Sequence, residues 1–289
     1  MQPIWESKLI QIEVTNACIN QCSNCNRCVG HHLKPFFMDL ETVEKAIESL
    51  EGYPGNIGLM GGEPTLHPQF PEICAIFQKK IPKKRRELWT AGYKWDEYKY
   101  LIWTTFEKEL ISFNDHSSLD GKHHPFLVAS KDIVPDSELR KALIDNCWVQ
   151  KRWSASITPF GCYFCEVAAA IDIAMGGKNG WPIEKDWWKK IPSEFGKQLE
   201  ICQNCGATIP IGETSDHASY DIISKSNLEK LKNSPKIKCG NYALYEKKWN
   251  RDDIIAKSRE WKPYQWRTFY AHSPEDYPKI TGGKNQMER

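Results

Sequence analysis

The chain has 289 residues, 40% of them hydrophobic and 26% charged, with a formal net charge of +2 at pH 7. This length and apolar content suffice for one large core or two smaller ones. The absence of any apolar run of about 18 residues excludes a transmembrane helix, and the near-zero charge does not favour a nucleic-acid partner. Because the N-terminus lacks a signal-peptide pattern, we expect a cytoplasmic protein whose 11 cysteines bind metal or serve redox chemistry.

Strands and helices are expected to alternate through the first half of the sequence. Apolar alternation or short apolar runs predict strands at residues 8–13, 57–60, 87–91, 110–113 and 126–129. Helical spacing predicts helices at residues 39–53, 68–80 and 95–106, the first of them capped by Asp39. Such alternation implies an α/β fold with a parallel sheet, which can curl into a full or partial (β/α) barrel, with ligands at the carboxyl ends of its strands.

A different pattern begins at residue 136. A capped helix is predicted at residues 136–146, and residues 153–168 read as two strands around a turn. A last helix is expected near residues 251–261, followed by an irregular tail. We therefore divide the chain into residues 1–135, 136–240 and 241–289.

Three cysteines follow the first predicted strand at C-x3-C-x2-C spacing. They are Cys18, Cys22 and Cys25. Three thiolates are one short of the four that usually hold a [4Fe–4S] cluster, so one iron would be free to bind another ligand. A zinc knuckle built from Cys22, Cys25 and Cys28 is the alternative. The second predicted strand ends in the sequence GGEP at residues 61–64.

These two motifs, each at the end of a strand, resemble those of the radical S-adenosylmethionine (radical SAM) superfamily. The resemblance implies a [4Fe–4S] cluster on the three cysteines, whose open iron takes the amino and carboxylate groups of S-adenosylmethionine. Asn24 departs from the family, which commonly has an aromatic residue before the third cysteine. The residues implied in binding this cofactor are Gly61, Gly62, Glu63 and Pro64, together with Thr90, Ser112, Asn114 and Asp115 near the ends of the third and fourth strands.

A second group of four cysteines lies between residues 136 and 240. They are Cys147, Cys165, Cys202 and Cys205. Their order around a hairpin resembles the twitch auxiliary-cluster domain, a half-sized relative of the SPASM domain, and implies a second [4Fe–4S] cluster with no open iron, in a small hairpin-plus-helix domain. A zinc ribbon on the same cysteines is an alternative, as is Cys162 in place of Cys165.

The resemblance implies that S-adenosylmethionine is reductively cleaved to methionine and a 5′-deoxyadenosyl radical, which takes a hydrogen atom from the substrate. It also implies flavodoxin or ferredoxin as the electron donor. Only seven residues precede the first predicted strand, so we expect a small carbohydrate-like substrate that is oxidised or epimerised. The alternatives are a peptide-modifying SPASM-type maturase and a non-enzymatic metal-binding module. Cys162 is a candidate hydrogen donor to a substrate radical, and Glu13 is either a substrate contact or a buried structural partner.

Overall fold

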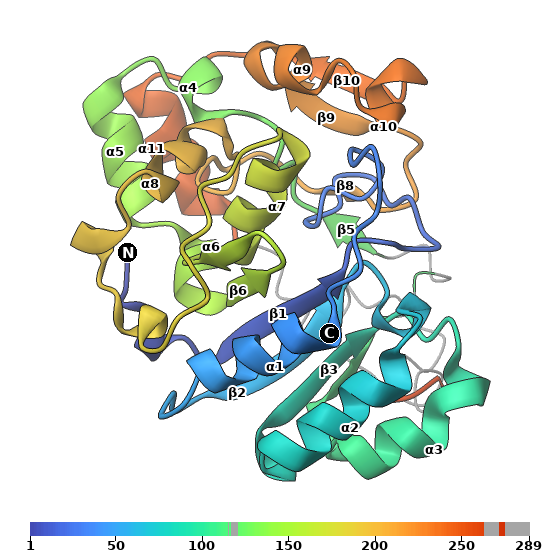
Figure 1. The fold of residues 1–289 in the computed structure, drawn as a ribbon. Helices are drawn as coiled ribbons and strands as arrows, with labels where there is room; N and C mark the ends of the chain where they lie inside the picture. Colours follow the sequence, from blue (N-terminus) through green and yellow to red (C-terminus); the bar gives the residue numbers. More distant parts are fainter. Residues whose placement is uncertain (115, 117–120, 263–271, 275–289) are drawn as a thin grey trace.

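The structure is a computed structural model that describes residues 1–114, 116, 121–262 and 272–274. Its centre is a six-stranded sheet in the order β4-β3-β2-β1-β6-β7, in which the first five strands are parallel and β7 is antiparallel to β6. The strands are β1 (Leu9–Thr15), β2 (Asn56–Gly61), β3 (Arg86–Thr90), β4 (Ile111–Phe113), β6 (Ala155–Thr158) and β7 (Gly161–Tyr163). The predicted α/β class with a parallel sheet is confirmed (Figure 1).

Three helices lie side by side along one face of the parallel strands (Figure 1). They are α1 (Leu40–Ser49), α2 (Phe70–Lys80) and α3 (Trp95–Thr105). Helix α1 begins as predicted, because the Asp39 side chain accepts a hydrogen bond of 2.7 Å from the backbone N–H of Thr42. The helices bury apolar stripes that include Val43, Phe77 and Ile102 in the same hydrophobic core as β1, all of whose residues are buried. The first four strands and first three helices are therefore confirmed, with small differences at their ends.

The strand predicted at residues 126–129 is wrong. These residues form a turn before the short helix α4 (Ser130–Ile133). All four side chains are buried, which is why the run resembles a buried strand. Its backbone bonds form no strand ladder: Val128 N donates to the Pro125 carbonyl within the turn at 3.2 Å, and Gly206 N donates to the Phe126 carbonyl at 2.9 Å.

The sheet position beside β1 is instead filled from the second half of the chain. Ile10 and Ile12 of β1 align in parallel with Ala155 and Ile157 of β6. The predicted hairpin is present, but its second strand ends at Tyr163 and is followed by helix α7 (Glu166–Ala174). The main sheet thus contains strands from both sides of the predicted boundary between residues 135 and 136. The division of the chain into three segments stays a prediction.

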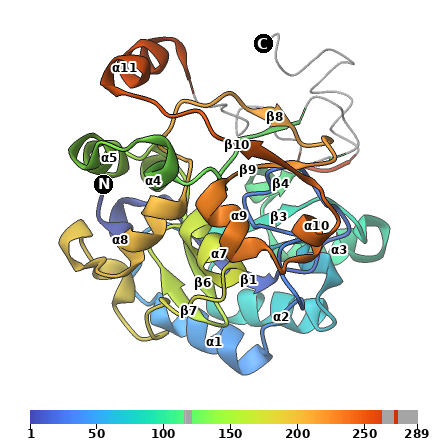
Figure 2. The ribbon, with the colours of Figure 1, turned by 90° about the horizontal axis from the view of Figure 1, so that it is seen from above.

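Two small sheets complete the described part of the fold. One pairs β5 (Lys122–His123) with β8 (Thr214–Ser215), and the other pairs β9 (Asp221–Ser224) with β10 (Tyr242–Tyr245). In the view of Figure 2, β9, α9 and α10 lie over the centre of the molecule. The remaining helices are α5 (Ser137–Asp145), α6 (Trp148–Arg152), α8 (Gln198–Ile201), α9 (Lys225–Leu231), α10 (Pro235–Lys238) and α11 (Arg251–Glu260).

Helices α5 and α11 confirm the predictions at residues 136–146 and 251–261. Within the described ranges, none of the helices combines the length and the apolar character needed to cross a bilayer. The predicted irregular tail falls mostly outside the described residues.

Candidate functional site

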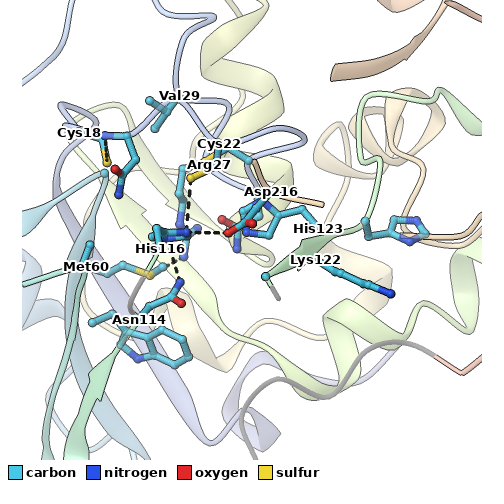
Figure 3. Close-up of a pocket in the computed structure, with 18 of the residues that line it drawn as sticks. Cys18, Cys22, Arg27, Val29, Met60, Asn114, His116, Lys122, His123 and Asp216 are labelled. Atoms are coloured by element: carbon cyan, nitrogen blue, oxygen red, sulfur yellow. Dashed lines mark hydrogen bonds and ion pairs between the residues drawn. The ribbon is translucent and has the colours of Figure 1, made fainter. Parts of the chain in front are cut away.

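A cavity at the carboxyl ends of β1 to β4 brings most of the predicted cofactor residues together (Figure 3). We call it the central cavity. The predicted residues that line it are Cys18, Cys22, Cys25, Gly61, Gly62, Thr90 and Asn114. Glu63, Pro64 and Ser112 are not among its lining residues, and Asp115 lies outside the described residues. Seven of the predicted residues thus meet in one cavity at the strand ends, and three do not line it.

Gly61 and Gly62 are required where the chain after β1 passes the end of β2. A Cβ atom on Gly61 would lie 2.1 Å from the carbonyl oxygen of Thr15, and one on Gly62 would lie 2.2 Å from that of Ala17. The same backbones are joined by a hydrogen bond of 2.8 Å from Gly62 N to the Thr15 carbonyl. The two glycines are thus needed to form this wall of the cavity, whatever the cavity binds.

Glu63 is fully buried, and its carboxylate joins the end of β2 to the end of β3. Oε1 accepts hydrogen bonds from the hydroxyls of Thr65 at 2.6 Å and Thr90 at 2.7 Å, and Oε2 accepts one from Ala91 N at 2.7 Å. With these donors in place, Glu63 holds the residues that line the cavity and does not line it itself. Its predicted contact with a cofactor stays a prediction.

The loop that carries the three cysteines is anchored on residues 214–239, through Asn24. This residue is buried and has a φ of 49°, a conformation that asparagine tolerates better than most residues. Its Nδ2 donates to Thr214 Oγ1 at 2.5 Å, and its Oδ1 accepts from Ile222 N at 2.9 Å. Asn24 is therefore a structural anchor at the position where the resembling family commonly has an aromatic residue.

A buried ion pair strengthens the same anchor. Asp221 Oδ1 lies 2.7 Å from Lys236 Nζ, and its Oδ2 lies 2.7 Å from His31 Nε2. Lys236 Nζ also donates to the carbonyl oxygen of Cys22 at 2.9 Å. Burial alone would raise the pKa of Asp221, but the hydrogen bond from His31 and the charge of Lys236 bring it below its ordinary value. A charged, fully bonded carboxylate thus fixes the cysteine loop.

The sequence suggested that the carboxylate of Glu13 could contact a substrate, but it is the guanidinium group of Arg27 that lines the central cavity. Arg27 lines the cavity and pairs with Glu13 at 3.0 Å and with Glu166 at 2.6 Å. Glu13 also accepts a hydrogen bond of 2.5 Å from Ser156, and it is not a lining residue. Burial opposes the charge of Arg27, yet the two carboxylates raise its pKa above the ordinary value. Of the two readings of Glu13, the buried structural partner is the one that these contacts support.

The second group of cysteines also meets in one place. A small cavity is lined by Cys147, Cys165, Cys202 and Cys205. Burial raises the pKa of each thiol, and neighbouring thiols of the group raise the pKa of Cys165, Cys202 and Cys205 further. Neutral, clustered thiols of this kind release protons when a metal binds them.

Cys162 belongs to neither cysteine group. Its side chain is fully buried, and its backbone pairs with that of Trp181 at 2.8 and 3.0 Å. Besides burial, the groups that shift its pKa are Lys45 and Glu184, not another thiol. The structure therefore does not bring Cys162 to the central cavity, where a hydrogen donor would have to lie, and it groups Cys165 with the other three cysteines.

Neither group of cysteines has the spacing expected of thiolates that share a single zinc ion. A zinc–sulfur distance of about 2.3 Å places tetrahedral thiolates about 3.8 Å apart. Over the described residues, the only set of three or more Cys, His, Asp or Glu side chains with ligand atoms all within 4.8 Å is Cys22, His116 and Asp216. No three cysteines of either group meet this criterion among the described residues.

Sequence reasoning missed the polar side chains beside Cys22. His116 Nδ1 lies 3.5 Å from Cys22 Sγ and 2.9 Å from Asp216 Oδ2 (Figure 3). Asp216 follows β8 and reaches the site because β8 pairs with β5. No local motif marks either residue, since their meeting depends on a pairing between distant segments.

The wall of the central cavity nearest the second cysteine group is aromatic. It contains Phe126, Trp148 and Trp153. Trp148 follows Cys147 in the sequence, and its Nε1 donates at 2.6 Å to the carbonyl of Ala207, which lines the small cavity. Trp148 therefore links this wall, which we call the shared aromatic wall, to the small cavity.

Comparisons with known proteins give weak similarity. No family model matches the sequence, and no curated protein matches it. Among solved structures, the chain is similar to BtrN in complex with AdoMet and 2-DOIA, with 19% identity, coverage of 69% of this chain and 92% of that one, and a TM-score of 0.44. It is also similar to selenomethionine BtrN in an open conformation, with 16% identity, coverage of 74% and 88%, and a TM-score of 0.39.

Proposed function

We propose that this chain is a radical SAM enzyme. The observation that carries the proposal is the meeting of the three C-x3-C-x2-C cysteines and the Gly61-Gly62 backbone in one cavity at the strand ends. No three of these thiols meet the spacing of ligands to one zinc ion among the described residues, and three thiolates would leave one iron of a [4Fe–4S] cluster open. When bound, such a cluster supplies the electron that cleaves S-adenosylmethionine to methionine and a 5′-deoxyadenosyl radical.

The residues of the central cavity would hold this cofactor in distinct ways. Cys18, Cys22 and Cys25 would ligate the cluster. Burial first, with neighbouring charges, raises the pKa of Cys18 to about 12, so metal binding there displaces a proton. The Gly61-Gly62 backbone, which packs against the Thr15 and Ala17 carbonyls and lines the cavity, would form the wall for the methionyl part. Thr90, whose hydroxyl donates to Glu63, and Asn114, whose amide nitrogen lies near His116, would line the space for the remainder.

We infer that Cys147, Cys165, Cys202 and Cys205 hold a second [4Fe–4S] cluster, closed by four thiolates. Its support is the shared small cavity and the absence of zinc-like spacing among these described cysteines. A cluster beside the shared aromatic wall would lie close to a substrate in the central cavity. It would suit the removal of an electron from the substrate radical. Flavodoxin or ferredoxin would supply the electron that cleaves S-adenosylmethionine.

The proposed substrate is a small carbohydrate-like molecule. The lining of the cavity includes the flat rings of Trp148 and Trp153 together with two cationic side chains, Arg27 and Lys122. Aromatic faces pack against the C–H face of a sugar ring, while a few polar groups bind hydroxyls and fix its orientation. Oxidation or epimerisation at one carbon is the proposed reaction class.

Metal analysis of anaerobically reconstituted protein tests the proposal. We expect about eight iron and eight sulfide per chain, and about four of each when Cys18, Cys22 and Cys25 are replaced together by Ala. Purification of the protein with zinc at full occupancy, and no uptake of iron and sulfide, would contradict it.

A further inference from the structure

His116 presents one nitrogen to a cysteine sulfur. Its Nδ1 lies 3.5 Å from Cys22 Sγ and 2.9 Å from Asp216 Oδ2, and its Nε2 lies 3.0 Å from Asn114 Nδ2. A carboxylate only accepts hydrogen bonds, and an amide nitrogen only donates them. Both neighbours therefore place the imidazole proton on Nδ1, where it is shared between the sulfur of Cys22 and the carboxylate of Asp216.

Asp216 is held firmly in this position. It is 5% exposed, and its backbone N donates to the Gly121 carbonyl at 3.0 Å. Its own carbonyl accepts a hydrogen bond of 2.8 Å from Ser23 N, in the cysteine loop. A Cβ atom on Gly121 would lie 2.3 Å from Asp216 Oδ2, so the glycine makes room for the carboxylate. The fold thus brings a negative charge and an N–H group to the same sulfur.

We propose that His116 is a positioning residue that, with Asp216, sets the reduction potential of the cluster held by Cys18, Cys22 and Cys25. The inference rests on the proposed function and extends it to residues that no motif assigns. A hydrogen bond to a ligand sulfur withdraws electron density and raises the potential of the cluster, whereas a nearby negative charge lowers it. Asp216 also competes with the sulfur for the same proton. The two residues therefore act in opposite directions.

A potentiometric titration followed by electron paramagnetic resonance tests the inference on the reconstituted full-length chain. The first cluster is identified as the signal that changes when S-adenosylmethionine is added. We expect His116→Leu to shift its midpoint potential to more negative values and Asp216→Asn to shift it to more positive values, with iron content unchanged in both. His116→Asn, which retains a side-chain N–H, should recover part of the shift.

His67→Gln is the matched control. His67 is also buried, but its Nε2 bonds to the Met38 carbonyl at 2.9 Å and not to sulfur, and it is not among the residues that line the central cavity. We expect the midpoint potential of this variant to equal that of the unaltered protein. An equal shift in this control, or an unchanged potential in His116→Leu, would overturn the inference.

Two further outcomes keep the test decisive. If His116→Leu loses iron, Asp216→Asn decides alone, because a negative or absent shift there contradicts the inference. If the unaltered protein has no signal that responds to S-adenosylmethionine, the proposed function falls and this inference falls with it. A responsive signal with unshifted variants overturns the inference alone.

Discussion

The backbone N–H of Asn24 donates a hydrogen bond of 2.5 Å to the carboxylate of Asp221, 197 residues later in the sequence. This contact joins the cysteine loop to the segment that begins with β9. The side chain of Asn24 adds bonds to Thr214 and Ile222. The first proposed cluster site is therefore assembled from segments about 190 residues apart in the sequence. Its stability should depend on residues, such as Asn24, that are not themselves cluster ligands.

Asn24→Ala should destabilise the protein and loosen the cysteine loop. The substitution leaves buried partners without hydrogen bonds and places alanine at a positive φ, which together should lower the free energy of unfolding by about 2–4 kcal/mol. We expect the variant to lose iron from the first site, about four of eight per chain. Chemical denaturation and iron analysis measure both effects.

Asn24→Gly is the control for that variant, because glycine removes the side chain but accepts the positive φ. We expect it to be more stable than Asn24→Ala, yet to lose iron from the same site. Full iron retention in both variants would show that the anchor is not needed to hold the loop.

Gly62→Ala should damage the fold as well as the site. The added Cβ would meet the Ala17 carbonyl oxygen at 2.2 Å, and a backbone clash of this kind typically costs about 1–3 kcal/mol. We expect a lower denaturation midpoint and reduced iron. Gly212→Ala is the control, since nothing lies within 4 Å of a Cβ there. Equal stability of the two variants would contradict the packing argument.

Cys162→Ala and Cys165→Ala should separate the two roles proposed for these thiols. Cys165 meets Cys147, Cys202 and Cys205 in the small cavity, so its loss should remove about four iron per chain and destabilise the surrounding fold. Cys162→Ala should retain about eight iron and lose only about 1 kcal/mol, because it removes one buried sulfur. The reverse pattern of iron loss would exchange the assignments.

Lowering the pH should reduce the free energy of unfolding, partly because His124 is protonated more readily in the unfolded chain. Burial lowers the pKa of His124 from 6.5 to about 4, opposed by its hydrogen bond to the Gly206 carbonyl. Between these values the unfolded chain binds a proton that the folded protein does not, so stability falls as the pH is lowered through 6.5. Between pH 7.5 and 5.5 this residue should contribute about 1 kcal/mol of the loss.

His124→Gln retains a donor for the Gly206 carbonyl and removes the titrating group. We expect its free energy of unfolding to fall less steeply with acid than that of the unaltered protein. The other histidines with lowered pKa remain in both proteins, so the difference isolates His124. Parallel pH profiles would contradict the assignment.

Local sequence patterns were good predictors of the strands and helices that carry the site. The short alternating runs of β1 to β3 and the Asp39 cap are local signals, and each appears within a few residues of its predicted position. The rule that ligands gather at strand ends then correctly joined the cysteines with Gly61 and Gly62. These successes share one cause, since each depends on residues that are neighbours in sequence or in adjacent strands.

The predictions that were wrong depended on distant pairing. Residues 126–129 are as apolar as a buried strand, but β6 occupies the place beside β1, and no local pattern distinguishes the two. His116 and Asp216 were not suggested by the sequence at all, since Asp216 comes to Cys22 through the pairing of β5 with β8 and a bond from Ser23 N to its carbonyl. The bonds of the Glu63 carboxylate to Thr65, Thr90 and Ala91 are likewise not visible in a motif.

The formation of 5′-deoxyadenosine tests the central claim most directly. The reconstituted protein is reduced with dithionite in the presence of S-adenosylmethionine, and methionine and 5′-deoxyadenosine are quantified by liquid chromatography and mass spectrometry. We expect slow formation of both in equal amounts by the unaltered protein and by Cys162→Ala, and none by the variant in which Cys18, Cys22 and Cys25 are replaced by Ala. No 5′-deoxyadenosine from unaltered protein that holds its full iron and sulfide would contradict the account.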